Sequence, residues 1–195
     1  MKCEEAIGIV KKYLPEKRLQ HTLRVADTAA LLADKYFADK EKAVLAAIFH
    51  DYCKYRPLEE MKRCIIESDL PKDLLEYHPE LWHGPVAAVL IAREHGIQDR
   101  EIRLAIQYHT TGRAHMSLLE MIVFLADYIE PGRNFPGVEE VRAMAEKDII
   151  QACYQASKNT IQHLMRKGEP IYPDTFYAYN ELTKRLNGGS VFGRK

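Results

Sequence analysis

The chain has 195 residues, which is enough for one domain and barely enough for two small ones. Apolar residues make up 47% of it and charged residues 29%, a profile that excludes a disordered chain, and no run of about 18 apolar residues could span a membrane. The 28 basic and 28 acidic residues cancel, whereas a nucleic-acid-binding protein normally carries a basic excess.

Helical periodicity dominates the sequence, with apolar residues at three- and four-residue steps and almost no strand-like alternation. In the stretch before residue 112, Asp39 is placed to cap the start of a helix and Gly96 to end one. The helices predicted there are, in chain order, 2–13, 16–35, 40–51, 59–68, a single turn at 73–77, 84–95 and 99–109.

The second part of the chain begins with the most apolar segment and then contains a Pro/Gly-rich break at 131–137. The helices predicted here are 117–130, 138–146, 147–167 and 173–186. We therefore expect an all-α helical bundle forming one domain over residues 1–187. Its core is predicted at about 15–135 and a C-terminal helical cover at about 137–187, with 188–195 as a tail.

Two carboxylates stand in places where a helix does not favour them. Asp127 follows an almost entirely apolar run, and burying a carboxylate is costly unless it is paired or bound to a metal. His50 and Asp51 end another apolar helix, where the helix dipole favours a protonated histidine and disfavours a carboxylate. A metal held by both residues would satisfy both, while a structural salt bridge is the alternative explanation for Asp127.

Three more histidines complete a pattern that extends over five predicted helices. His21 lies near the edge of an apolar stripe, His83 precedes a helix start, and His109 ends a helix. Each alone is more often a core or capping histidine than a ligand, so only the joint pattern indicates a site. Six imidazole and carboxylate ligands are too many for one catalytic ion, which must keep an open position, and they suit two bridged divalent ions.

The order of His21, His50-Asp51 and Asp127 resembles the HD superfamily of metal-dependent phosphohydrolases. Longer phrases, over about residues 15 to 185, resemble its symmetrical bis(5′-nucleosyl)-tetraphosphatases; Cys53 departs from them, where a smaller alanine is expected. These phrases are His50-Asp51-Tyr52-Cys53-Lys54, His83-Gly84-Pro85, Tyr108-His109-Thr110-Thr111-Gly112 and Ala126-Asp127-Tyr128-Ile129-Glu130-Pro131-Gly132-Arg133.

This resemblance implies an HD-domain helical bundle, a di-iron centre and hydrolysis of diadenosine tetraphosphate to two molecules of ADP. It implies that Asp51 bridges the two metals, and our hypothesis is that a metal-bridging hydroxide attacks an inner phosphorus while ADP leaves. The metal ligands that it implies are His21, His50, Asp51, His83, His109 and Asp127.

A substrate with four ionised phosphates needs cations besides two metals. Lys54 lies about one turn after Asp51, and Arg133 follows a Pro-Gly turn after Asp127, so we predict that both reach the site and act with Asp51 in catalysis. The end of the 99–109 helix offers hydroxyls and a backbone N–H, although a helix C-cap explains it equally well. The predicted substrate contacts are Lys54, Thr110, Thr111, Gly112 and Arg133.

Several alternatives stay open at this stage. Imidazole and carboxylate ligands also accept manganese and other first-row metals, and iron comes from the family resemblance. The chain would otherwise be an HD phosphohydrolase for another nucleotide, such as a deoxynucleotide or a cyclic dinucleotide. Outside that class it would be a nucleotide-binding sensor without catalysis, or a helical interaction domain that binds no metal.

The remaining expectations concern partners and location. The four cysteines have no metal-site spacing and indicate free thiols. The start of the chain lacks the apolar stretch of a signal peptide, so we expect a cytoplasmic protein. We expect a small-molecule nucleotide as partner, no nucleic acid and no membrane, and the sequence leaves a homodimer open.

Overall fold

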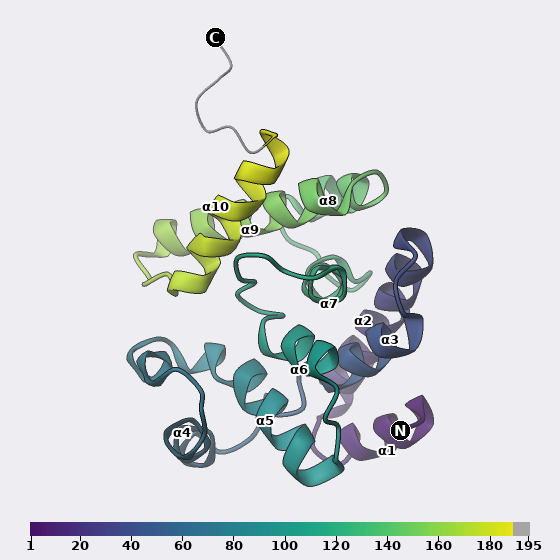
Figure 1. Ribbon diagram of the computed structural model, residues 1–195, viewed down its shortest axis with the longest axis vertical. Helices are drawn as coiled ribbons and strands as arrows, with labels where there is room; N and C mark the ends of the chain where they lie inside the picture. The colour runs from purple at the N-terminus through teal and green to yellow at the C-terminus, as the bar shows by residue number, and fades with distance from the viewer. Residues whose placement is uncertain (189–195) are drawn as a thin grey trace.

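The computed structural model describes residues 1–188, and in that range the chain forms ten α-helices, two short 3-10 helices and no strand (Figure 1). The all-α prediction is confirmed; apart from Gly188, the predicted tail lies outside the described residues. The elements are α1 (Cys3–Val10), α2 (Glu16–Tyr36), α3 (Lys40–Phe49), α4 (Leu58–Glu67), η1 (Lys72–Glu76), η2 (Pro79–Leu81), α5 (His83–His95), α6 (Arg100–Gln107), α7 (Leu118–Ile129), α8 (Val138–Ala145), α9 (Ile149–Lys167) and α10 (Pro173–Leu186).

Helix α7 lies at the centre of the bundle, where Figure 1 shows it end-on. It packs against α2, α3 and α6 on one side and against α8 and α9 on the other. Its apolar side chains are buried nearly all round, as the sequence predicted for a helix without a polar face. Any polar group on α7 is therefore held in a fixed place by the surrounding helices.

The helices form two groups around α7. In the view of Figure 1, α1, α4, α5 and α6 lie below it, α2 and α3 lie beside it, and α8 to α10 lie above it, with α9 and α10 packed on each other. The helices of the predicted C-terminal cover, 137–187, are thus α8, α9 and α10. No helix of residues 1–188 is both long and apolar enough to cross a membrane, and all four cysteines are free, as predicted.

Some helix boundaries differ from the prediction. The first helix was expected to reach Tyr13 but ends at Val10, because i→i+3 bonds such as Tyr13 N–H to Val10 O tighten its last turn. Helix α3 ends at Phe49, and bonds of the same kind, such as Tyr52 N–H to Phe49 O, continue the chain as a series of turns. His50 and Asp51 therefore lie in a turn rather than inside the helix.

Side-chain caps set the beginnings of several helices. The Asp39 carboxylate accepts the Lys42 N–H at 3.0 Å, which confirms the predicted N-cap of α3. At the start of α7, Ser117 and Glu120 form a capping box, and the Arg113 guanidinium holds the buried Glu120 carboxylate at 2.5 and 2.9 Å. The capping box fixes where α7 begins, and with it the position of Asp127 near the other end.

We expect Ser117→Ala to lower the free energy of unfolding by about 1 kcal/mol, because the Glu120 N–H at the start of α7 loses its acceptor. Urea unfolding followed by circular dichroism measures this loss. Ser117→Asp, which keeps an acceptor at the cap position, is the matched control and should unfold close to the original chain. Equal stability of all three proteins would contradict a contribution from the cap.

Candidate metal centre

The six residues predicted as metal ligands meet at one place between helices α2, α3, α5, α6 and α7. All are buried except Asp127, whose side chain is 19% exposed and opens toward solvent. The side chains come from α2 (His21), the turn after α3 (His50 and Asp51), the start of α5 (His83), the turn after α6 (His109) and the last part of α7 (Asp127).

The Asp51 carboxylate lies between two groups of imidazoles. Its Oδ2 atom is 3.1 Å from His50 Nε2 and 3.6 Å from His21 Nε2. Its Oδ1 atom faces the other way and is 3.2 Å from His83 Nε2, which in turn is 3.0 Å from His109 Nε2. One carboxylate therefore touches both halves of the cluster, each half through a different oxygen.

Asp127 completes the half of the cluster that contains His21 and His50. Its Oδ1 atom is 3.1 Å from His21 Nε2 and 3.9 Å from His50 Nε2. Two sets of donor atoms lie close enough to share an ion: His21, His50 and Asp127 in one, and His50, Asp51 and His109 in the other. Imidazole nitrogens and carboxylate oxygens in such sets suit divalent first-row metals.

Each imidazole has its Nδ1 atom on an acceptor outside the cluster. An acceptor there places the ring proton on Nδ1, so the lone pair of Nε2 points into the cluster. The four pairs are His50 Nδ1 to Ala47 O (2.6 Å), His83 Nδ1 to Glu80 O (2.6 Å), His109 Nδ1 to Ile106 O (2.8 Å) and His21 Nδ1 to Glu130 Oε1 (3.0 Å).

Three buried atoms of the cluster have no hydrogen-bond partner: His21 Nε2, His50 Nε2 and Asp51 Oδ2. Buried polar atoms in native proteins are nearly always satisfied, and these three are electron donors that face one another. A divalent cation between them would satisfy all three at once. The donor set therefore fits a metal centre.

The charges of the cluster agree with this fit. Burial, together with the nearby His83 and His50, lowers the pKa of His109 to about 3, which keeps this imidazole neutral at neutral pH. Burial opposes ionisation of Asp127, but the neighbouring His21 and His50 rings and the Arg133 guanidinium outweigh it and hold its pKa well below the usual range. The site thus holds an ionised carboxylate and a neutral imidazole, the forms in which both residues bind metals.

Two arginines stand against the carboxylates of the cluster. Arg133 was predicted to reach the site, and its guanidinium lies 2.5 Å from Asp127 Oδ1. Arg18 was not predicted; its Nη1 atom lies 3.0 Å from Asp51 Oδ2, an ion pair without the geometry of a hydrogen bond. The signal for Arg18 was available, because it stands one helical turn before His21 on the same predicted helix.

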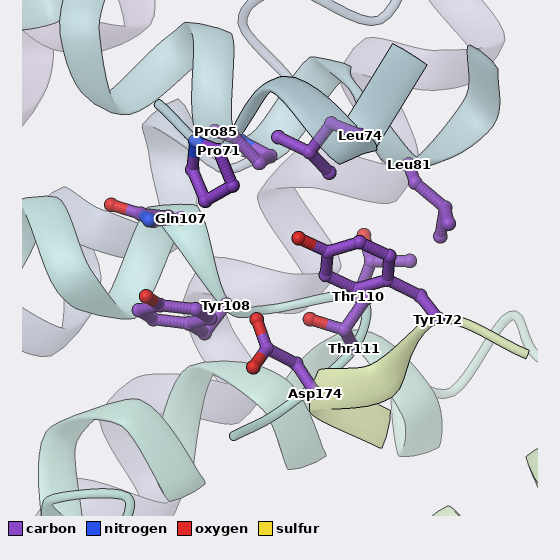
Figure 2. A pocket seen from close by; sticks show the side chains of 10 residues that line it. All are labelled: Pro71, Leu74, Leu81, Pro85, Gln107, Tyr108, Thr110, Thr111, Tyr172 and Asp174. Atoms are coloured by element: carbon purple, nitrogen blue, oxygen red, sulfur yellow. The ribbon is translucent and has the colours of Figure 1, made fainter. Parts of the chain in front are cut away.

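Of the other predicted substrate contacts, Thr110 touches the cluster, whereas Lys54 and Thr111 have partners outside it. Lys54 forms an ion pair with Glu80 at 2.5 Å rather than with a carboxylate of the cluster. Thr110 touches the cluster directly, with its Oγ1 atom 3.0 Å from His109 Nε2. Thr111 and Thr110 both border a small cavity beside Asp174, as Figure 2 shows, and the Thr111 hydroxyl donates to Gly112 O.

Gly112 turns the chain after α6. Its φ of +63° is in the left-handed region, and a Cβ there would come within 3.1 Å of Ala178 on α10. Its N–H donates to Tyr108 O at 2.8 Å. The C-cap of α6 is Tyr108, so Gly112 closes a separate turn beyond the helix and is not the helix C-cap that the sequence offered as an alternative to phosphate contact.

The buried Glu130 carboxylate is a part of the site to which the sequence gave no role, although it stands in the phrase that carried the resemblance. It accepts Arg24 Nε at 2.5 Å and Gly132 N at 2.6 Å as well as His21 Nδ1. Burial opposes its ionisation, but these donors outweigh it and lower its pKa to about 2. Glu130 is therefore a charged anchor that sets the orientation of the His21 ring.

Comparison with known proteins agrees with this geometry. The sequence model of the HD domain matches residues 18–132, a range that contains all six cluster residues. A symmetrical bis(5′-nucleosyl)-tetraphosphatase of Bacillus subtilis is 54% identical over 93% of this chain and 98% of its own. Proteins of the same description from Halalkalibacterium halodurans and Staphylococcus aureus are 51% and 44% identical, over 91% and 92% of this chain and 95% and 94% of theirs.

A solved structure has the same fold. The crystal structure of a predicted HD superfamily hydrolase involved in NAD metabolism, from Clostridium acetobutylicum, superimposes with a TM-score of 0.89 at 37% sequence identity. The match covers 95% of this chain and 98% of the other. Likeness of this extent places the whole described chain, including α8 to α10, in one architecture with that hydrolase.

We expect Glu130→Gln to weaken metal binding by about 10- to 100-fold, because the anchor of His21 loses its charge. Competition between the protein and a chelator of known affinity measures this change. Glu146→Gln, which removes an exposed carboxylate paired with Lys35, is the matched control and should bind metal normally. If both variants hold metal equally well, Glu130 does not position His21 for a metal.

Proposed function

Because the chain belongs to the HD-domain family and, within it, to the symmetrical bis(5′-nucleosyl)-tetraphosphatases, we propose that it hydrolyses diadenosine tetraphosphate to two molecules of ADP. The main structural support for this proposal is that four imidazole Nε2 atoms and two carboxylates converge at one site, which is partly open to solvent. The identity of the proposed substrate comes from the names of relatives that are 44 to 54% identical over almost the whole chain.

The proposed ligands of two divalent ions are the six cluster residues, with Asp51 shared between the ions. The two oxygens of Asp51 face different imidazoles, which supports this sharing. Two such ions, when bound, lower the pKa of a water and offset charge on the phosphoryl group that the water attacks. Iron is the first candidate because of the family resemblance, and the donor set accepts manganese as well.

The residues around the cluster have distinct tasks in this proposal. The guanidiniums of Arg18 and Arg133 lie at the exposed side, where they can bind phosphate oxygens in a bidentate manner. The Thr110 hydroxyl beside His109 is placed to contact a phosphate at the other half of the cluster. Lys54, held by Glu80, steadies the segment that leads to His83.

Symmetrical cleavage follows if water attacks one of the two inner phosphorus atoms. The bond between that phosphorus and the central bridging oxygen breaks, and the oxygen leaves on the other half. Each half then carries one adenosine and two phosphates, so both products are ADP. A phosphate leaving group needs little protonation at neutral pH, which is consistent with the lack of an assigned general acid.

The proposed activity is tested by purifying the chain without oxygen or chelator, measuring its metal content and incubating it with diadenosine tetraphosphate. We expect about two equivalents of a transition metal per chain and ADP as the sole nucleotide product, separated by ion-exchange chromatography. ATP and AMP in equal amounts would mean asymmetric cleavage and would overturn the proposal. Asp51→Ala is the negative control and should lose metal and turnover together.

A second prediction separates phosphate binding from metal binding. Arg133→Ala should reduce turnover by about 100- to 1000-fold, as expected for removal of one charged donor, and leave the metal content unchanged. Steady-state kinetics and elemental analysis of the same sample measure both. Arg166→Ala, on the exposed face of α9, is the control. Loss of metal from Arg133→Ala would instead make Arg133 a support for Asp127.

A further inference from the structure

An open groove of about 350 Å³ begins at the metal cluster and runs along the first turns of α2. On one side it is bordered by residues of α2 that recur at three- and four-residue steps and so share a helix face. On the other side lie Tyr55 and the turn after α7. The side chains that matter here are Lys17, Arg18, His21, Arg24, Tyr55 and Arg133.

The groove concentrates positive charge in a chain whose net charge is zero. Arg18, Arg24 and Arg133 each face one carboxylate, at 3.0, 2.5 and 2.5 Å. Lys17 is exposed and forms no ion pair with any carboxylate of residues 1–188. Metal ions on the cluster carboxylates would leave the groove with a clear excess of positive charge, as a polyphosphate requires.

The turn after α7 is shaped to leave room for one of these cations. The Arg24 guanidinium passes directly over Gly132, where a Cβ would come within 2.5 Å of Arg24 Nη2. Any other residue at 132 would push Arg24 out of its place against Glu130. A glycine here therefore keeps the floor of the groove cationic.

Tyr55 gives the groove an aromatic rim. Tyr55 is 56% exposed and borders the same groove as Arg18. A single exposed tyrosine is ordinary on a protein surface, and its position beside the phosphate-binding cations is what gives it a role here. An exposed ring at this point can stack on a nucleotide base whose phosphates lie among the cations.

We propose that this groove binds one nucleoside diphosphate half of the substrate, with Lys17, Arg18 and Arg24 on the phosphates and Tyr55 stacked on the base. The inference rests on the proposed function and adds to it the place of one half of the substrate. Beyond Arg18, it assigns binding roles to Lys17, Arg24 and Tyr55, three residues outside the metal cluster. It also explains why an overall neutral chain can hold a highly anionic substrate.

The test is direct binding of ADP and of inorganic pyrophosphate to the metal-loaded protein, measured by calorimetry. Tyr55→Ala should weaken ADP binding by about 5- to 100-fold and leave pyrophosphate binding unchanged, because only ADP has a base to stack. Tyr55→Phe keeps the ring and should bind ADP normally. Tyr177→Ala removes an equally exposed tyrosine, also 56% exposed, from α10 and is the matched control.

Lys17→Ala should weaken ADP and pyrophosphate binding by a similar factor of several-fold, and this difference should shrink at high salt. Lys12→Ala, another exposed lysine, is its control. The inference is overturned if Tyr55→Ala binds ADP as Tyr177→Ala does, or if Lys17→Ala binds both ligands as Lys12→Ala does. All variants should keep their metal.

The two proposals fail in distinguishable ways. If the protein does not cleave diadenosine tetraphosphate but the groove variants lose affinity for ADP, the groove binds the nucleotide and the proposed function is wrong. If the protein releases ADP from diadenosine tetraphosphate but the groove variants bind ADP normally, the proposed function holds and the nucleotide binds at another place.

Discussion

The arrangement of the site depends on one buried carboxylate, Asp51, whose two oxygens lie within 3.6 Å of three imidazole Nε2 atoms. Lone pairs that face one another in a dry interior repel, and such an arrangement is stable only if a cation lies among them or protons are taken up. The surrounding elements hold it nonetheless, since the cluster residues come from α2, the turn after α3, the start of α5, the turn after α6 and α7. The fold thus maintains a geometry that its own residues satisfy only incompletely.

Helix ends explain how the histidines are aimed. The carbonyls of a last helical turn have no partner within the helix, so a histidine three residues later can donate its Nδ1 proton to one of them. His50, His83 and His109 all do so, to Ala47, Glu80 and Ile106. His21 lies inside α2, where the backbone carbonyls are engaged, and it takes its acceptor from Glu130 at the end of α7 instead.

Electrostatic balance links Glu130, the anchor of His21, to the groove beside the metal cluster. Each of the carboxylates Asp51, Asp127 and Glu130 faces an arginine, and all three arginines border the same groove. The cations that offset buried negative charge are thereby also the cations that a phosphate chain would meet. Metal ions on the carboxylates and a phosphate chain on the arginines would then lie side by side.

The sequence by itself determined the helices, the buried character of α7, the cap at Asp39 and, through the resemblance, the six residues that meet at the cluster. These follow from local periodicity, from capping chemistry and from short phrases, all of which involve neighbours along the chain. Only the tertiary structure decided that Glu130 holds His21, that Arg18 faces Asp51, that Lys54 pairs with Glu80, and that Gly112 closes a turn against α10. Each of these contacts depends on how separate segments pack, and the energy that selects one partner for a charged side chain comes from that packing rather than from its neighbours in sequence.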